Sequence, residues 1–151
     1  MAYTTTSALQ ARLGSSVYAR LTDRVAGATA DATVAQQILN EADAEVNAHL
    51  ARRYQTPVDL AARPELAEVL EARTLDIAEY LAWRGSPFVS DLPQRVKAMH
   101  AQALVWLMAV SEGRLDLPAL QTVEAAAANS TQVRFDAGGG RTFTAEQLDG
   151  L

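Results

Sequence analysis

The sequence contains no cysteine, so it can form no disulfide, no thiolate metal site and no thiol nucleophile. No apolar run approaches the roughly 20 residues that a membrane-spanning helix requires. The first ten residues, MAYTTTSALQ, lack the basic and apolar regions of a secretory signal. We therefore expect a protein that makes no membrane contact and that is made and folded in a reducing cytoplasm.

Basic residues are also too few for one class of function. Lys and Arg number 13 against 18 Asp and Glu, which gives a formal net charge of −5. A protein that neutralises many phosphates of duplex DNA normally has a basic balance and a basic patch. The 49% hydrophobic and 21% charged content suits a soluble globular protein, and 151 residues are most simply one domain.

Signals for catalysis or metal binding are weak throughout. The two histidines, His49 and His100, lie on different predicted helices without metal-ligand spacing, so hydrogen bonding is their ordinary role. No GxSxG elbow is present, and GGGRT at 138 to 142 lacks the Gly-Lys-Ser/Thr order of a phosphate loop. No spacing singles out a catalytic pair among the acidic residues. We predict no enzyme activity, no cofactor and no metal.

The 3.6-residue spacing of apolar side chains predicts helices as far as about residue 118. A short first helix follows the cap types at 5 to 7 and ends at Gly14, and a second short helix starts at Ser15 or Ser16. Asp31 or Thr33 is expected to cap a long core helix that reaches Leu50.

Two further helices complete this predicted body. Pro64 suits a first helical position, and the apolar pattern that follows it ends at Gly85. Ser90 or Asp91 is expected to cap the last helix, with Gly113 as its stop signal. Because the connections are short, the sequence predicts an all-α fold in which the helices form a compact antiparallel bundle, residues 1 to 118.

Residues 119 to 151 have a different character. ALQTVEAAAA favours a further helical turn or two, whereas TQVRFD and RTFTA alternate around three glycines at 138 to 140, as in a β-hairpin or extended arm. A lone hairpin is marginal in water, so we expect this C-terminal arm to contact a sister subunit or another partner. The expected interface residues are Val133, Arg134, Phe135, Arg141, Phe143 and Leu148.

The stretch NAHLARRYQTPVDLAARP, residues 47 to 64, joins two predicted helices, and we refer to it as the elbow. Arg52, Arg53 and Tyr54 close one helix, and Pro57 prevents its continuation. The arginine stems can cover the helix end while the guanidinium groups meet carbonyls of the last turn or a carboxylate such as Asp76. We interpret this set as a structural corner, with direct contact to a partner protein as the alternative.

Several motifs, taken in order, resemble the Mu-like phage neck proteins. They are Tyr3 with Leu9 and Leu13-Gly14, LTDR at 21 to 24, ADAEVNAHLARRYQTPV at 42 to 58, DIAEYLAWR at 76 to 84 and ALVWLMAVSEG at 103 to 113. The resemblance covers about residues 3 to 118, and RTFTAEQLDGL is similar to the Arg-x-Phe ending of such proteins. His100 is a departure, because an aromatic residue is expected there in the family.

The resemblance implies a structural head-tail connector, also called an adaptor or head-completion protein, of a tailed phage or prophage. Such a protein forms a homo-oligomeric ring, twelvefold by the same resemblance, beneath the portal protein and joins it to a tail or stopper protein. DNA only passes through the central channel. The expected location is the virion neck, after assembly in the host cytoplasm.

A small helical DNA-binding regulator is the alternative, because the chain is short and mostly helical. Arg12, Arg20 and Arg24 form a loose basic cluster near the N-terminus. The acidic balance and the lack of a helix with several basic residues on one face count against this function.

Overall fold

The computed structural model describes residues 2 to 117 and 120 to 130. Within these ranges the fold is all-α, as predicted, with no strand and one isolated bridge between Tyr54 and Thr122. The elements are α1 (Thr6–Leu13), α2 (Ser15–Thr22), α3 (Ala32–Leu50), the 3-10 turn η1 (Pro64–Leu66), α4 (Ala67–Gly85), α5 (Gln94–Ser111) and α6 (Val123–Ser130). The predicted hairpin and its interface residues 133 to 148 lie outside the described residues.

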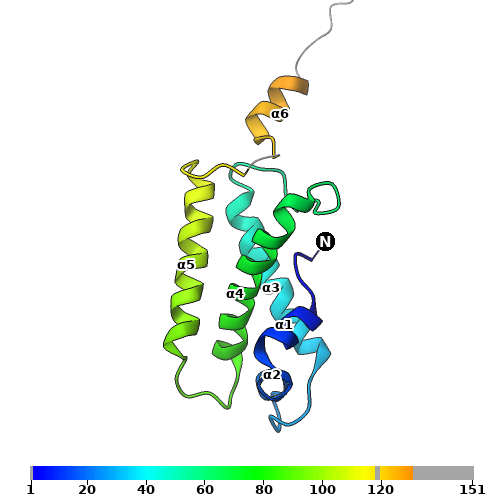
Figure 1. The fold of residues 1–151 in the computed structure, drawn as a ribbon, viewed down its shortest axis with the longest axis vertical. Helices are drawn as coiled ribbons and strands as arrows, with labels where there is room; N and C mark the ends of the chain where they lie inside the picture. The colour runs from blue at the N-terminus through cyan, green and yellow to red at the C-terminus, as the bar shows by residue number, and fades with distance from the viewer. Residues whose placement is uncertain (1, 118–119, 131–151) are drawn as a thin grey trace, which may run out of the picture.

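The three long helices α3, α4 and α5 lie side by side along the long axis of the molecule, each running opposite to the next (Figure 1). The short helices α1 and α2 pack across α3 and α4 near the end opposite to α6 (Figure 1). The elbow therefore lies at the α6 end, together with the segment that follows α5. None of the helices in the described ranges is long and apolar enough to cross a membrane.

The predicted helix starts agree with the structure at two positions. The Thr5 hydroxyl accepts a hydrogen bond from the Ala8 N–H, and the Asp31 carboxylate accepts from the N–H groups of Thr33 and Val34. These bonds satisfy N–H groups that have no partner inside the helix. Gly14 has a φ of 80°, a backbone conformation that other residues rarely adopt, so a glycine is required where α1 meets α2.

The predicted start of the last helix is wrong. α5 begins at Gln94 with Pro93 in the N-cap position, and no side chain caps it. Asp91 forms a surface pair with Lys97 instead, with 3.2 Å between its Oδ1 and the Lys97 Nζ. Proline fixes the φ angle of the residue ahead of the first turn, which stabilises a helix start without a capping side chain.

The apolar stripes of the long helices meet in one core. Its fully buried members include Leu39, Val46 and Leu50 of α3, Leu70 and Ile77 of α4, and Leu107 and Val110 of α5. Burying a side chain of this size stabilises a fold by about 1.5 to 3 kcal/mol. The core thus holds α3, α4 and α5 in fixed positions and positions the elbow at their end.

The loop between α2 and α3 is organised by one carboxylate, that of Asp23 in the LTDR motif. Its two oxygens accept hydrogen bonds from the backbone N–H groups of Val25, Ala26, Ala28 and Thr29, at 2.9 to 3.1 Å. These four donors favour the charged form and lower the pKa of Asp23 well below its ordinary value. The loop therefore depends on an ionised Asp23.

Thr22, the residue before Asp23, holds the same loop from its buried side. The buried Thr22 hydroxyl donates to the Tyr18 carbonyl at 2.8 Å and accepts from the Asp31 N–H at 3.1 Å. Gly27, with a φ of 68°, lies against the Phe88 ring, where a Cβ would come within 3.2 Å of ring carbons. The loop is thereby packed onto the connection between α4 and α5.

Replacing Asp23 by alanine is expected to change how stability depends on pH. Because the folded state lowers the Asp23 pKa, its contribution is present above the ordinary value of 3.8 and is lost as the pH falls toward the lower folded value. The difference in unfolding free energy between wild type and Asp23→Ala should therefore shrink from about pH 5 to about pH 2. Urea unfolding across this range measures it, and a difference that is independent of pH would contradict the loop assignment.

Candidate functional site: the elbow and its ion pairs

The elbow is closed by contacts with the segment that follows α5. The buried Tyr54 hydroxyl accepts a hydrogen bond from the Leu117 N–H at 3.1 Å, and the Arg53 carbonyl accepts one from the Val123 N–H at 2.8 Å. The Arg53 guanidinium lies over the Tyr54 ring, 5.5 Å from its centroid. The elbow therefore connects the end of α3 to both the end of α5 and the start of α6.

The carboxylate partner predicted for the elbow arginines, Asp76, is wrong. Arg53 Nη1 pairs with Asp116 Oδ1 at 2.7 Å, on the segment after α5, while Arg52 is exposed. The bond to Asp116 raises the pKa of the Arg53 guanidinium, and this effect is larger than the decrease that burial causes. Asp76 is buried on α4 and is bound by Arg12 and Arg73.

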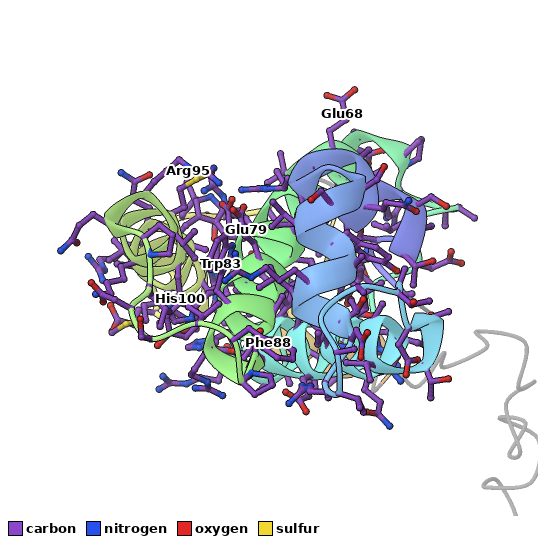
Figure 2. The ribbon with its side chains drawn as sticks, turned by 90° about the horizontal axis from the view of Figure 1, so that it is seen from below. Glu68, Glu79, Trp83, Phe88, Arg95 and His100 are labelled. Carbon is purple, nitrogen blue, oxygen red and sulfur yellow. The ribbon has the colours of Figure 1, made fainter. Side chains whose placement is uncertain are left out.

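Arg12 is the centre of an ion-pair network between α1, α4 and α5, in which the two carboxylates are buried. Its guanidinium binds Asp76 and, at 2.8 Å, Glu79, while Arg73 and Arg95 bind the remaining oxygens of the two carboxylates. Figure 2 shows Glu79 facing Arg95 between the two helices. Burial lowers the pKa of Arg12, but the two carboxylates raise it by more, so its pKa is raised overall. We call these five residues the Arg12 network.

The N-terminus reaches the elbow through Tyr3. Its hydroxyl accepts a hydrogen bond from the Val58 N–H at 2.9 Å and donates one to the Asn47 side-chain oxygen. Its own N–H donates to Asp43 on α3 at 3.2 Å. Burial raises the pKa of the Tyr3 hydroxyl, and it also raises the pKa of the Asp43 carboxyl, although the bond from Tyr3 lowers the latter. Tyr3 therefore fixes the start of the chain to α3 and to the elbow.

A groove of about 610 Å³ runs along the elbow. Its walls come from Pro57 to Arg63 on one side and from Leu120 to Ala127 on the other, so α6 forms part of it. The Thr56–Pro57 peptide is cis. Val123 is 49% exposed at this groove. The lining is mostly apolar, with Asp59 and Arg63 as the charged groups, which suits contact with a protein segment more than binding of a charged small molecule.

His100 occupies the position where the family resemblance led us to expect an aromatic residue. Its ring stacks on Tyr80 with 3.9 Å between centroids and 9° between planes, and Arg84 lies on the same tyrosine ring. Burial lowers the pKa of His100, Glu45 raises it and Arg84 lowers it further, with a net decrease. The imidazole thus serves as the stacking partner of Tyr80, and the described residues contain no group of metal ligands around it.

Replacing Arg53 by alanine is expected to lower the melting temperature only slightly. Asp116 is 75% exposed, and exposed ion pairs contribute little because water and salt screen them. Asp116→Asn should give a decrease of the same size. A thermal melt of both variants tests this, and a much larger loss in Arg53→Ala alone would show that its stacking on Tyr54 matters more than the pair.

The Arg12 network and the contacts of Tyr3 were not predicted from the sequence. A signal was present for one half of the network, since Asp76 and Glu79 are spaced i, i+3 on the apolar side of α4. Nothing in the sequence indicated which arginine would meet them. The predicted interface residues Val133, Arg134, Phe135, Arg141, Phe143 and Leu148 lie outside the described residues.

These features define a helical protein whose ion pairs and tyrosine contacts position its segments. The model of the family described as Bacteriophage Mu, Gp36 matches residues 3 to 135. The chain therefore belongs to the Bacteriophage Mu Gp36 family and is a protein of a Mu-like phage. A comparison with curated proteins found no match.

Proposed function

We propose that the chain is a head-tail connector subunit of a Mu-like phage or prophage. It forms a ring in the virion neck, between the portal protein and a tail or stopper protein, and leaves a channel through which DNA passes. Membership of the Mu Gp36 family is the observation that carries this proposal. An antiparallel helical bundle with an arm for intersubunit contacts is the architecture that we propose for it.

The acidic balance of the chain supports a wall along which DNA slides. A net charge of −5 gives little attraction to phosphates, whereas a basic channel would hold them. The N-terminal arginines add little attraction for DNA, since they make bonds within the chain. Arg12 is bound in its network, Arg24 Nη1 donates to the Gly85 carbonyl at 2.7 Å, and Arg20 donates to the Phe88 carbonyl.

These bonds count against the alternative of a DNA-binding regulator. The basic cluster that favoured it consists of Arg12, Arg20 and Arg24. Arg12 is bound to two carboxylates, and the exposed Arg20 and Arg24 each donate one hydrogen bond to a backbone carbonyl in the same chain. A regulator needs such side chains free to reach phosphates or base edges. These contacts therefore weaken the basis for that function.

The α6 end is the part of the body that we assign to partner contacts. The elbow, the groove beside it and α6 lie together at this end, and the arm follows α6 in the sequence (Figure 1). Val133, Phe135, Phe143 and Leu148 supply apolar anchors, and Arg134 and Arg141 supply charge. We propose that the arm, residues 131 to 148, packs on an adjacent subunit or another neck protein.

Co-purification with the portal protein of the same phage tests the proposal. The full chain should be retained by a tagged portal, and a chain that lacks residues 131 to 151 should fold with similar helix content but lose this retention or its association with sister subunits. Imaging of the particle neck should show the chain in a ring. A full chain that ignores the portal and retards duplex DNA would overturn the connector proposal in favour of the regulator.

A further inference from the structure

The outer face of α5 carries an apolar seam that no other part of the described chain covers. Ala98, Ala101, Val105 and Met108 are all exposed, with Val105 64% and Met108 45% accessible. Their spacing of three, four and three residues places them on one line along the helix. Two large apolar side chains on a line of helical spacing form a surface for another helix rather than scattered exposed residues.

This seam lies at the edge of the molecule. α5 is the outermost helix on one side in both views (Figures 1 and 2), and it contacts α3 and α4 on its opposite face. A groove of about 500 Å³ lies beside the seam and is lined by Arg73, Ala101, Gln102, Val105, Trp106 and Ala109. Because Arg73 belongs to α4, the shallow groove extends the apolar surface toward that helix.

We propose that this seam binds α5 of a second copy of the chain in antiparallel orientation. In that orientation Ala98 faces Met108 of the second copy, and Ala101 faces Val105 of the second copy. Every layer then pairs a small side chain with a larger one, which gives close packing without voids. A parallel arrangement would pair each residue with the same residue of the second copy, so the two layers that contain only alanine would be poorly filled.

The dipole of α5 agrees with the antiparallel orientation. Antiparallel packing sets the positive end of one helix dipole against the negative end of the other, whereas a parallel pair would bring like ends together. The charged side chains at the two ends do not decide the orientation, because Arg95 pairs with Glu79, Lys97 with Asp91 and Glu112 with Arg114 in the same chain.

This α5 contact is distinct from the contacts that would build the proposed ring. A two-fold contact of one face with itself is closed after two copies and cannot propagate around a ring. The dimer is therefore a form of the free protein, in which the α5 seam is covered before any assembly.

The first experiment measures association of the full chain by sedimentation velocity over a range of concentrations. The wild type should form a dimer, and Val105→Lys should raise its dissociation constant by at least about tenfold, because the new charge is buried against the second copy and near Arg73. Val25→Lys is the matched control, since Val25 is 90% exposed on the loop after α2. Circular dichroism checks that both variants stay folded. A monomeric wild type, or association unaffected by Val105→Lys, would overturn the proposal.

The second experiment tests orientation and register, and it uses the absence of native cysteine. A mixture of an Ala101→Cys chain and a Val105→Cys chain should form a disulfide-linked heterodimer under mild oxidation, because these positions face each other. An Ala98→Cys chain mixed with a Val105→Cys chain should cross-link much more slowly, since the two positions are nearly one turn out of register. A mass label on one chain identifies the heterodimer. Equal rates in the two mixtures would refute the antiparallel α5 contact.

Discussion

Replacing Arg12 by methionine is expected to lower the free energy of unfolding by about 3 kcal/mol, which corresponds to a melting temperature lower by roughly 10 °C in a chain of this size. Methionine keeps most of the aliphatic volume but removes the charge. Asp76 and Glu79, whose side chains are only 6% and 2% exposed, then keep their charges with one arginine fewer between them. Removing one member of a buried ion pair costs more than the pair contributes, because the remaining charge has lost its compensation.

Arg95→Met provides the comparison within the same network. Its side chain is 63% exposed, so solvent screens its pair with Glu79 more strongly than the pairs of Arg12, and a smaller loss of stability is expected. Adding Asp76→Asn and Glu79→Gln to Arg12→Met removes the two buried negative charges and should recover part of the lost stability, because the side chains of Arg73 and Arg95, which then lack a partner, are 32% and 63% exposed. Urea unfolding of the four proteins measures these differences. Equal losses in Arg12→Met and Arg95→Met would show that Arg12 is not the centre of the network.

Replacing Tyr3 by alanine is expected to lower the free energy of unfolding by about 3 to 5 kcal/mol, as for other buried aromatic side chains. The loss combines a cavity between α3 and the elbow with the loss of both hydroxyl bonds. Tyr3→Phe separates the two effects: it keeps the ring and leaves the buried Val58 N–H without its acceptor, which should cost about 1 to 3 kcal/mol. Thermal and urea unfolding measure both variants. If Tyr3→Phe were as stable as the wild type, the bond to Val58 would not fix the elbow.

The local part of the fold could be predicted from the sequence because its causes are local. The caps Thr5 and Asp31 act on N–H groups within three residues, and Gly14 is needed for a single backbone angle. The start of α5 was misplaced because Asp91 is as good a cap as Asp31 by residue type alone. A pair with Lys97 and the position of Pro93 decided the outcome.

The partners of the arginines could not be predicted, because they depend on how the helices pack. Arg53 and Asp116 are 63 positions apart in the sequence. Several carboxylates were therefore equally plausible partners for Arg53, and only the packing of the end of α5 beside the elbow selects Asp116. Arg12 and Asp76 are 64 apart and meet only because α1 packs on α4. A long arginine side chain can pair with any carboxylate within its reach, and the sequence alone does not show which carboxylates the fold brings that close.

The parallel axes of α3, α4 and α5 have a mechanical consequence. A force applied between the α6 end and the opposite end of the body is carried by three hydrogen-bonded rods together, rather than by one stretch of backbone (Figure 1). Sliding of α4 past its neighbours is resisted where Arg12 and Arg95 hold its buried carboxylates from two other helices. We therefore expect the body to be stiff along its length, with bending under load concentrated in the elbow.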